Sequence, residues 1–314
     1  MSSGNGARVN MMAGAGAGVI NCVLCSPLDV AKVRQQLQGA FVPGSPKYEG
    51  VFSTVRTIYK EEGAPGLFRG LRPSLMTMPL FWAIYFPVYG AMNQRLALMS
   101  NGDSATWQHC VAAITAGFAA DCATNPLWVV RTRMISDIYH SPDTPTPSGL
   151  APNGAESPAV TRLGVFRRML YIGRTEGVTA LYKGLSASML GLSHVAIQFP
   201  VYEKFKQFAR RHRNDSKETI LDLIVSSALS KAIASTITYP HEVVRSRLQD
   251  SRSRTRLRDV VHRIMVEEGW HGFFRGLQVN LVRVLPSCVT VFVSYELISR
   301  AITTQFPSLA NSSS

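Results

Sequence analysis

Acidic and basic residues recur at fixed spacing after three prolines, and their types suit ion pairing or the binding of an anion. The three copies read Pro27-Leu-Asp29-Val-Ala-Lys32-Val-Arg34, Pro126-Leu-Trp128-Val-Val-Arg131-Thr-Arg133 and Pro240-His-Glu242-Val-Val-Arg245-Ser-Arg247. Because positions i and i+3 share one face of a helix, the acid and the first cation of a copy point to the same side. The second copy has Trp128 where the other two have an acid.

A second motif follows each copy, and it consists of Glu-Gly with a cation-Gly pair seven residues later. Its copies are Glu62-Gly63 with Arg69-Gly70, Glu176-Gly177 with Lys183-Gly184, and Glu268-Gly269 with Arg275-Gly276. Two motifs that recur in the same order at three places indicate three repeats of about a hundred residues each. We place these repeats at residues 1–103, 104–214 and 215–314.

Each repeat contains two long apolar stretches, which lie at residues 9–38, 71–99, 106–136, 185–211, 217–250 and 277–304. All are long enough to cross a bilayer, which takes about 20 residues. Gly, Ser, Thr and single charges such as Lys231 interrupt them, as expected for helices with one face on lipid and one on a wet cavity. The sequence predicts an all-α membrane protein with six tilted transmembrane helices in three pseudo-threefold repeats, joined by short helices. Residues 139–158, rich in Pro and Ser, are expected to form a loop.

Composition narrows the classes of partner. The chain has 314 residues, is 46% hydrophobic and carries a formal net charge of +13, which fits nucleic acid, an anionic membrane surface or an anionic small molecule. Nucleic acid is disfavoured because the cations recur at helix ends instead of forming one patch. An enzyme is disfavoured because we find no nucleophile with its base, no metal cluster and no phosphate-binding loop. Cys22 and Cys25 form a C-x-x-C pair that fits helix packing better than redox or metal chemistry.

Together, the two triplicated motifs resemble those of the mitochondrial carrier family, and the resemblance covers essentially the whole chain. It implies short helices on the matrix side, one substrate site near the membrane midplane and two gates that open in turn. It also implies a monomer in the mitochondrial inner membrane, with peroxisomal and plastid membranes as alternatives. No cofactor or metal is expected, and cardiolipin is a candidate bound lipid. No N-terminal targeting segment is evident.

The resemblance assigns one gate to the proline motifs. Pro27, Pro126 and Pro240 are expected to kink their helices so that these converge. The matrix gate would comprise Asp29, Lys32, Gln36, Trp128, Arg131, Glu242, Arg245 and Gln249. By the pairing order of the family, Asp29 meets Arg131 and Glu242 meets Lys32. Arg245 is left free for an anionic substrate or for a cation–π contact with Trp128, which alternatively only packs. The two glutamines are expected to hydrogen-bond to the ion pairs from below.

The other gate of the family lies at the cytoplasmic end, and its motif is incomplete here. The residues that map to it are Tyr89, Tyr202, Glu203, Lys206, Tyr295 and Glu296. Only the copy from Tyr202 to Lys206 has both the acid and the cation in place. We therefore expect weak closure at this end, which makes net uptake plausible beside strict exchange.

The substrate contacts of the family map to three regions inside the bundle. We add two cations to them: Lys231, expected at mid-membrane depth, and Arg245 of the third motif copy. The expected substrate-binding residues are Trp82, Gly191, Leu192, His194, Lys231, Arg245 and Arg283. Trp82 suits stacking on an aromatic base, although it is also a candidate packing residue, and Arg283 suits a phosphate or carboxylate. The surrounding sequence is similar to the family branch that carries NAD, FAD, folate and pyrimidine nucleotides. We expect an anionic nucleotide-type cofactor, NAD or FAD, as substrate, with folate or a pyrimidine nucleotide as the alternative.

Overall fold

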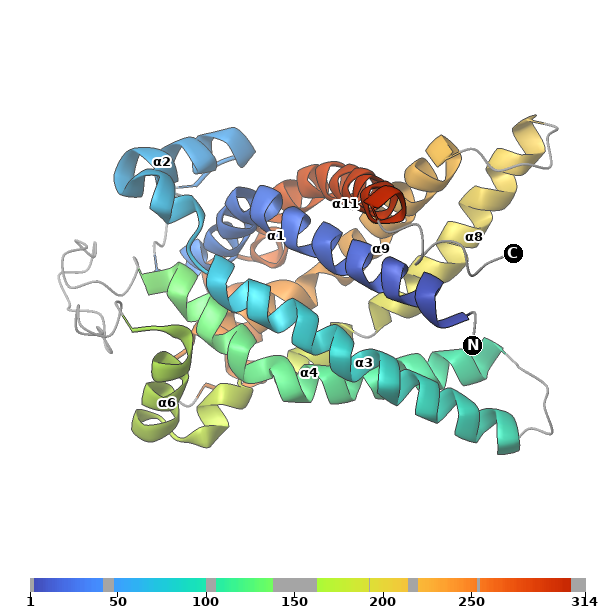
Figure 1. The fold of residues 1–314 in the computed structure, drawn as a ribbon. Coiled ribbons are helices and arrows are strands. Elements are labelled where there is room, and N and C mark those ends of the chain that lie inside the picture. The colour runs from blue at the N-terminus through green and yellow to red at the C-terminus, as the bar shows by residue number, and fades with distance from the viewer. Residues whose placement is uncertain are drawn as a thin grey trace.

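The structure is a computed structural model that describes residues 3–41, 48–99, 106–137, 163–191, 193–213, 220–252 and 255–305. All regular structure in these ranges is helical (Figure 1), which confirms the predicted all-α class. The long helices are α1 (Ser3–Phe41), α3 (Leu71–Met99), α4 (Thr106–Ser136), α8 (Ser193–Arg213), α9 (Ile220–Asp250) and α11 (Leu277–Gln305). The short ones are α2 (Val51–Leu67), α6 (Val165–Thr175), η2 (Val178–Tyr182), α7 (Leu185–Gly191), α10 (Leu257–Glu267) and η3 (Trp270–Phe274). The loop predicted at 139–158 lies outside the described residues.

The long helices pack with pseudo-threefold order. The most extensive contacts join α1 to α11, α3 to α4, and α8 to α9. The first helix of each repeat thus packs on the second helix of the repeat before it, and α11 closes the ring onto α1. Helices α1, α4 and α9 also touch one another. Figure 1 shows α2 and α6 at one end of the bundle and the N-terminal end of α1 at the other.

We call the end of the bundle that carries the three proline motifs the motif end. Pro27, Pro126 and Pro240 lie inside α1, α4 and α9, as predicted. The residue before each proline uses its side chain to hold the second motif of the same repeat against the helix. These hydrogen bonds run from Ser26 Oγ to Leu67 O (3.3 Å), from Asn125 Nδ2 to Leu181 O (2.8 Å) and from Tyr239 OH to Arg275 O (3.2 Å). The two motifs therefore form one unit in each repeat.

The glycines of the second motif allow the chain to turn back toward the helix. Gly63 and Gly70 have φ of 70° and 83°, a left-handed region that side chains with a Cβ rarely adopt. The equivalent glycines of the other two repeats also have positive φ. These turns bring the preceding glutamate under the end of the long helix.

Three apolar clusters stabilise the motif end, one in each repeat. At the centre of each is an isoleucine four residues before the glutamate of the second motif, Ile58, Ile172 or Ile264, and all three are fully buried. Burying such a side chain contributes about 1.5–3 kcal/mol. The short helices are thereby attached to the long ones and fix the height of the second motif.

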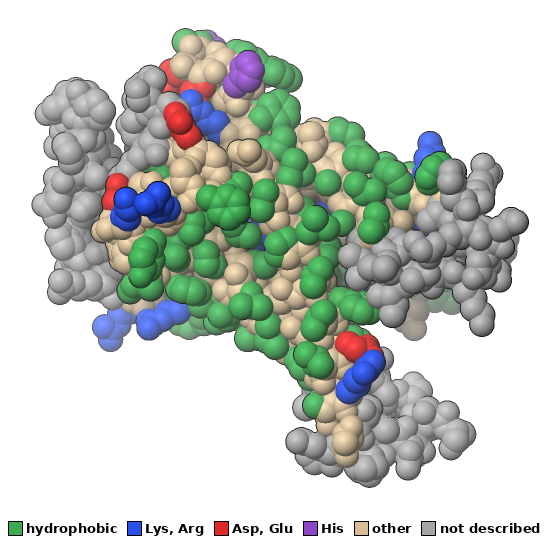
Figure 2. All heavy atoms as spheres, turned by 90° about the horizontal axis from the view of Figure 1, so that it is seen from above, with side chains coloured by type: hydrophobic (Ala, Val, Ile, Leu, Met, Phe, Trp, Pro, Cys, Tyr) green, Lys and Arg blue, Asp and Glu red, His purple; other side chains and the backbone are tan. Residues whose placement is uncertain are grey.

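The outer surface of the bundle is apolar over the long helices. Three of the described segments are long and apolar enough to span a membrane: Ala13–Gly39, Leu71–Met99 and Trp270–Ile302. Helices α4 and α9 are equally long, at 31 residues each, but Asp121 and Lys231 interrupt them. In Figure 2 hydrophobic side chains cover the middle of the visible face, and the charged ones gather toward its ends. This distribution is the one expected for a bundle embedded in lipid.

Candidate functional site

Two ion pairs join the first helices of the repeats at the motif end. Lys32 of α1 contacts Glu242 of α9, and Asp29 Oδ2 of α1 lies 3.4 Å from Arg131 Nη2 of α4. Both pairs are those that the pairing order of the resembled family implied, and both are confirmed. They lie where α1, α4 and α9 meet, so they hold this end of the bundle closed.

Each of these two cations also forms a hydrogen bond to the second long helix of a repeat. Lys32 Nζ donates to Asn280 Oδ1 of α11 at 2.9 Å, and Arg131 Nε donates to Ser74 Oγ of α3 at 2.6 Å. Neither polar partner belongs to the triplicated motifs. The closed end is therefore a network that spans first and second helices.

Arg283 of α11 belongs to the same network. Its Nε lies 2.6 Å from Asp29 Oδ1, so Asp29 holds two cations, Arg283 and Arg131. Arg283 was predicted to contact the substrate, and its contact with Asp29 was not foreseen. An anion that binds Arg283 would have to compete with Asp29 for it.

Arg245 is not free, so that part of the prediction was wrong. Its Nη2 lies 3.7 Å from Asp121 Oδ1 of α4. The predicted contact with Trp128 is confirmed, because the Arg245 guanidinium is 5.5 Å from the ring centroid, and Arg131 is 5.3 Å from it. Asp121 lies outside the repeated motif, and motif analysis therefore missed it.

The two glutamines join neighbouring helices, but the hydrogen bonds that the structure shows for them do not go to the ion pairs as predicted. Gln36 donates to Tyr239 OH at 3.0 Å and accepts from Ser246 Oγ at 2.7 Å, which connects α1 to α9. Gln249 Oε1 accepts from Thr132 Oγ1 at 2.8 Å, which connects α9 to α4. The side chains reach sideways to the next helix because they lie one turn beyond the charged layer.

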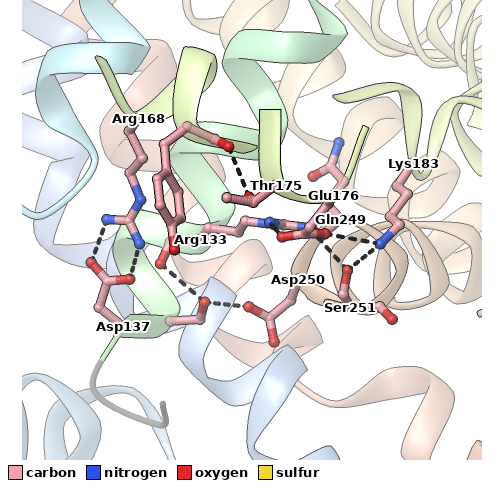
Figure 3. A network of polar contacts seen from close by, with 11 residues as sticks. Arg133, Asp137, Arg168, Thr175, Glu176, Lys183, Gln249, Asp250 and Ser251 are labelled. Carbon is pink, nitrogen blue, oxygen red and sulfur yellow. Dashed lines mark hydrogen bonds and ion pairs between the residues drawn. The ribbon is translucent and has the colours of Figure 1, made fainter. Parts of the chain in front are cut away.

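A second charged layer lies beyond the glutamines, and it repeats in all three units. In the second repeat Glu176 accepts from the fully buried Arg133, with 2.9 Å from Nη2 to Oε2, and pairs with Lys183 at 3.3 Å (Figure 3). The equivalent triads are Arg34–Glu62–Arg69 and Arg247–Glu268–Arg275. The sequence showed the constant spacing of these residues but not that the two motifs meet through them.

These triads also connect one repeat to the next. Arg133 Nε donates to Gln249 O at 3.1 Å, and Lys183 Nζ donates to Ser251 O at 2.7 Å, both at the C-terminal end of α9 (Figure 3). Arg247 Nε likewise donates to Gln36 O of α1 at 3.0 Å, five residues before that helix ends at Phe41. Cations at a helix C-terminus satisfy its free carbonyls and oppose its dipole.

The charge of Glu176 is stabilised by this arrangement. Burial raises the pKa of the Glu176 carboxyl, but the hydrogen bond and the charge of Arg133, followed by the charge of Lys183, lower it by more. The net result is a pKa below the ordinary value of 4.5. Glu176 is therefore ionised at neutral pH.

Lys231, another predicted substrate residue, lies on α9 nine residues before Pro240. Lys231 of α9 is partly buried and lies within electrostatic reach of Cys288, Arg283, Lys32 and Glu242. Both expected cations, Lys231 and Arg283, therefore face the interior charges of the bundle.

Two further predicted positions lie between α7–α8 and α9. His194 Nδ1 is 3.2 Å from Thr238 Oγ1. Gly191 approaches α9 so closely that a Cβ at this position would lie 2.6 Å from His241 Nε2. Leu192 lies outside the described residues. The absence of a side chain at Gly191 thus allows α7 and α9 to approach each other closely.

Trp82 belongs to a row of aromatic side chains on α3. Its ring stacks on Phe86 with 5.2 Å between centroids, and it meets Phe81 and Tyr85 edge to face. Because 48% of Trp82 is exposed, one side of the ring is available for another planar group.

At the predicted cytoplasmic gate, the contacts that we describe do not resemble those of the motif end. Lys206 lies over the ring of Tyr202 in the same helix, at 5.9 Å, and Arg300 pairs with Glu296 in the same helix, at 2.9 Å. Tyr89 OH is 3.1 Å from His109 Nδ1, which joins α3 to α4.

Comparison with known proteins agrees with the triplicated architecture. The model of the mitochondrial carrier protein family matches residues 5–100, 102–213 and 216–306. The chain belongs to the mitochondrial carrier family. This carrier is therefore a multi-pass membrane protein of a transporter family, and its three repeats correspond to the three matches.

Several relatives of the carrier are similar along nearly its whole length. The chloroplastic nicotinamide adenine dinucleotide transporter 1 of Arabidopsis thaliana is 36% identical, over 95% of this chain and 93% of the relative. The mitochondrial nicotinamide adenine dinucleotide transporter 1 of Saccharomyces cerevisiae is 38% identical, over 92% and 76%. Solute carrier family 25 member 36 of Mus musculus is 31% identical, over 92% and 96%.

Proposed function

We propose that this carrier moves NAD+ across the mitochondrial inner membrane by alternating access. The observation that carries the proposal is the set of cations above the closed motif end: Arg283, Lys231 and Arg245. Relatives whose names state NAD transport and that match over nearly the whole chain support the same substrate.

The cations suit the pyrophosphate of NAD+. Arginine binds phosphate oxygens through two parallel hydrogen bonds, and such charge-assisted bonds are about twice as strong as neutral ones. Lys231 adds a point charge near Arg283. In the closed structure Arg283 is already paired with Asp29, with 2.6 Å between Nε and Oδ1. A phosphate that takes this arginine therefore removes one partner from Asp29.

This competition provides a route from binding to gate opening. Asp29 is shared between Arg283 and Arg131, so loss of Arg283 changes the balance of charge within the α1–α4 pair. Partly exposed ion pairs contribute only about 0–1 kcal/mol each. A substrate that binds the open form better by a few kcal/mol is then sufficient to shift the population.

Trp82 would select for a ring-bearing substrate. Stacking of a base on an aromatic side chain is worth about 1–3 kcal/mol, and Trp82 with Phe86 offers a stacked aromatic surface on α3. FAD, folate and pyrimidine nucleotides also contain planar rings and anionic groups, so they are the competitors to be tested.

We further propose that the carrier works as a monomer, without a cofactor or metal, and binds cardiolipin. A groove of about 550 Å³ between α7–α8, α9 and α10 supports lipid binding. Its lining is apolar and includes Leu190, Ile197, Leu257, Val261 and Phe273. Such a surface accommodates acyl chains.

The test is uptake by purified carrier in liposomes. Labelled NAD+, FAD, folate, UTP and ADP are each offered outside, to vesicles loaded with NAD+ and to empty ones. We expect NAD+ to enter fastest, to be recovered chemically intact, and to enter empty vesicles as well, because only one copy of the cytoplasmic gate motif has both its acid and its cation. Preferred uptake of any other compound, or no NAD+ uptake above protein-free liposomes, would refute the assignment.

A further inference from the structure

Asp121 stands out among the buried acids because it lies outside both repeated motifs and faces a motif cation. Its carboxylate Oδ1 is 3.7 Å from Arg245 Nη2, and only 12% of its side chain is exposed. Arg245 is the cation that lacks a motif acid, because Trp128 occupies that position in the second repeat.

The other repeats differ at the equivalent position. Asp121 comes five residues before Pro126, and the residues five before Pro27 and Pro240 are Cys22 and Ser235. Those two repeats keep their own motif acids, Asp29 and Glu242. An acid is thus added in the one repeat that has lost one.

The added acid lies at a different height. Asp121 precedes Trp128 by seven residues, about 10 Å along a helix. Arg245 spans this region, since it contacts Asp121 at 3.7 Å and the Trp128 ring at 5.5 Å. Its only other carboxylate within electrostatic reach among the described residues is Glu242, which already pairs with Lys32.

We propose that Asp121 is the third acidic partner of the matrix gate, displaced by two helical turns from the motif position toward the substrate site. Trp128 fills the vacated place and supports the Arg131 and Arg245 cations with its ring. Three ion pairs therefore join α1, α4 and α9 in the gate of this carrier, and Arg245 is held by an acid that an entering phosphate would displace. Asp121 acts through Arg245 and is a positioning residue.

The first experiment relocates the acid. Asp121→Asn should lower the NAD+ exchange rate in liposomes about tenfold, within the range of coupling between contacting residues. Adding Trp128→Asp, which restores the motif acid, should bring the rate back to within about threefold of wild type. Glu267→Gln, which removes an exposed carboxylate on α10, is the control and should change nothing. An unaffected Asp121→Asn carrier, or a loss that Trp128→Asp does not repair, would overturn the proposal.

The transport assay above rests on the proposed function. A second measurement does not depend on the substrate. Thermal unfolding of purified Asp121→Asn, Arg245→Gln and the double variant gives the coupling between the two side chains. The double variant leaves no orphan charge and should be at least as stable as Arg245→Gln alone. Additive losses would overturn the pairing. Absence of NAD+ uptake by the wild type would refute the substrate but leave this test valid.

Discussion

Arg283 contacts Asp29 in the closed structure and, in our account, a substrate phosphate during transport. We predict that Arg283→Ala lowers NAD+ uptake by more than about a hundredfold, because both the bidentate contact and its charge are lost. Arg283→Lys keeps the charge but cannot form two parallel hydrogen bonds, and its uptake rate should lie between those of wild type and Arg283→Ala. Initial uptake rates in liposomes measure this, and full activity of Arg283→Ala would remove the residue from the site.

Trp82 provides a second prediction for a single residue. Trp82→Ala should raise the KM for NAD+ about tenfold or more, because stacking of one base is worth about 1–3 kcal/mol. Trp82→Phe keeps an aromatic face and serves as the matched variant, with a smaller change expected. Equal KM values for the Ala and Phe variants would show that the ring only packs on α3.

The contacts of single residues could be predicted from the sequence only where both partners belong to the repeated motifs. The pairs of Lys32 with Glu242 and of Asp29 with Arg131 followed from the pairing order that the family resemblance implies. A repeated motif places its members at one height on symmetry-related helices, which makes such pairs possible. The partners of Arg245 and Arg283 did not, because they depend on how far a long side chain reaches along a neighbouring helix. Asp121 had one sequence signal, its position in the only repeat without a motif acid.

At the scale of helices, the triads of the second charged layer fasten each short helix to a long one. Glu268 is 3% exposed between Arg247 and Arg275, whereas the adjacent Glu267 is 43% exposed. Glu268→Gln leaves two cations without their acid and should destabilise the carrier by about 3 kcal/mol. Glu267→Gln is the neighbouring control. Equal melting temperatures for the two variants in detergent would contradict a stabilising role of the triad.

The same layer predicts a dependence of stability on pH. Because the pKa of folded Glu176 is lowered below 4.5, its contribution is present above that pH and is lost as the pH falls through the lower folded value. The melting temperature of Glu176→Gln should therefore lie below that of wild type at neutral pH, and the gap should narrow as the pH falls below about 4.5. A gap that is constant with pH would show that Glu176 does not titrate with folding.

The elements themselves were largely readable from the sequence. Hydrophobic length and the two motifs predicted the six long segments and the short helices between them. The hydrogen bonds from Ser26, Asn125 and Tyr239 were not foreseen, because three different side chain types make the same link. Such a link becomes visible only once the second motif is seen folded against the helix.

The whole molecule is a pseudo-threefold bundle closed at the motif end by ion pairs between α1, α4 and α9. Transport requires this end to separate while the other end closes. The glutamine layer offers a site to lock it, since Ser246 Oγ and Gln36 Oε1 are 2.7 Å apart across α9 and α1. Neither residue was assigned to substrate binding.

The most direct test is to lock and release the motif end in one preparation. The carrier with Gln36→Cys and Ser246→Cys is reconstituted and treated with a short reducible bis-methanethiosulfonate cross-linker, with each single variant as control. We predict that the cross-linked double variant takes up no labelled NAD+, that reduction restores its uptake, and that the single variants remain active under the same treatment. If the cross-linked carrier takes up NAD+ as fast as it does after the cross-link has been cleaved, there is no gate at this end.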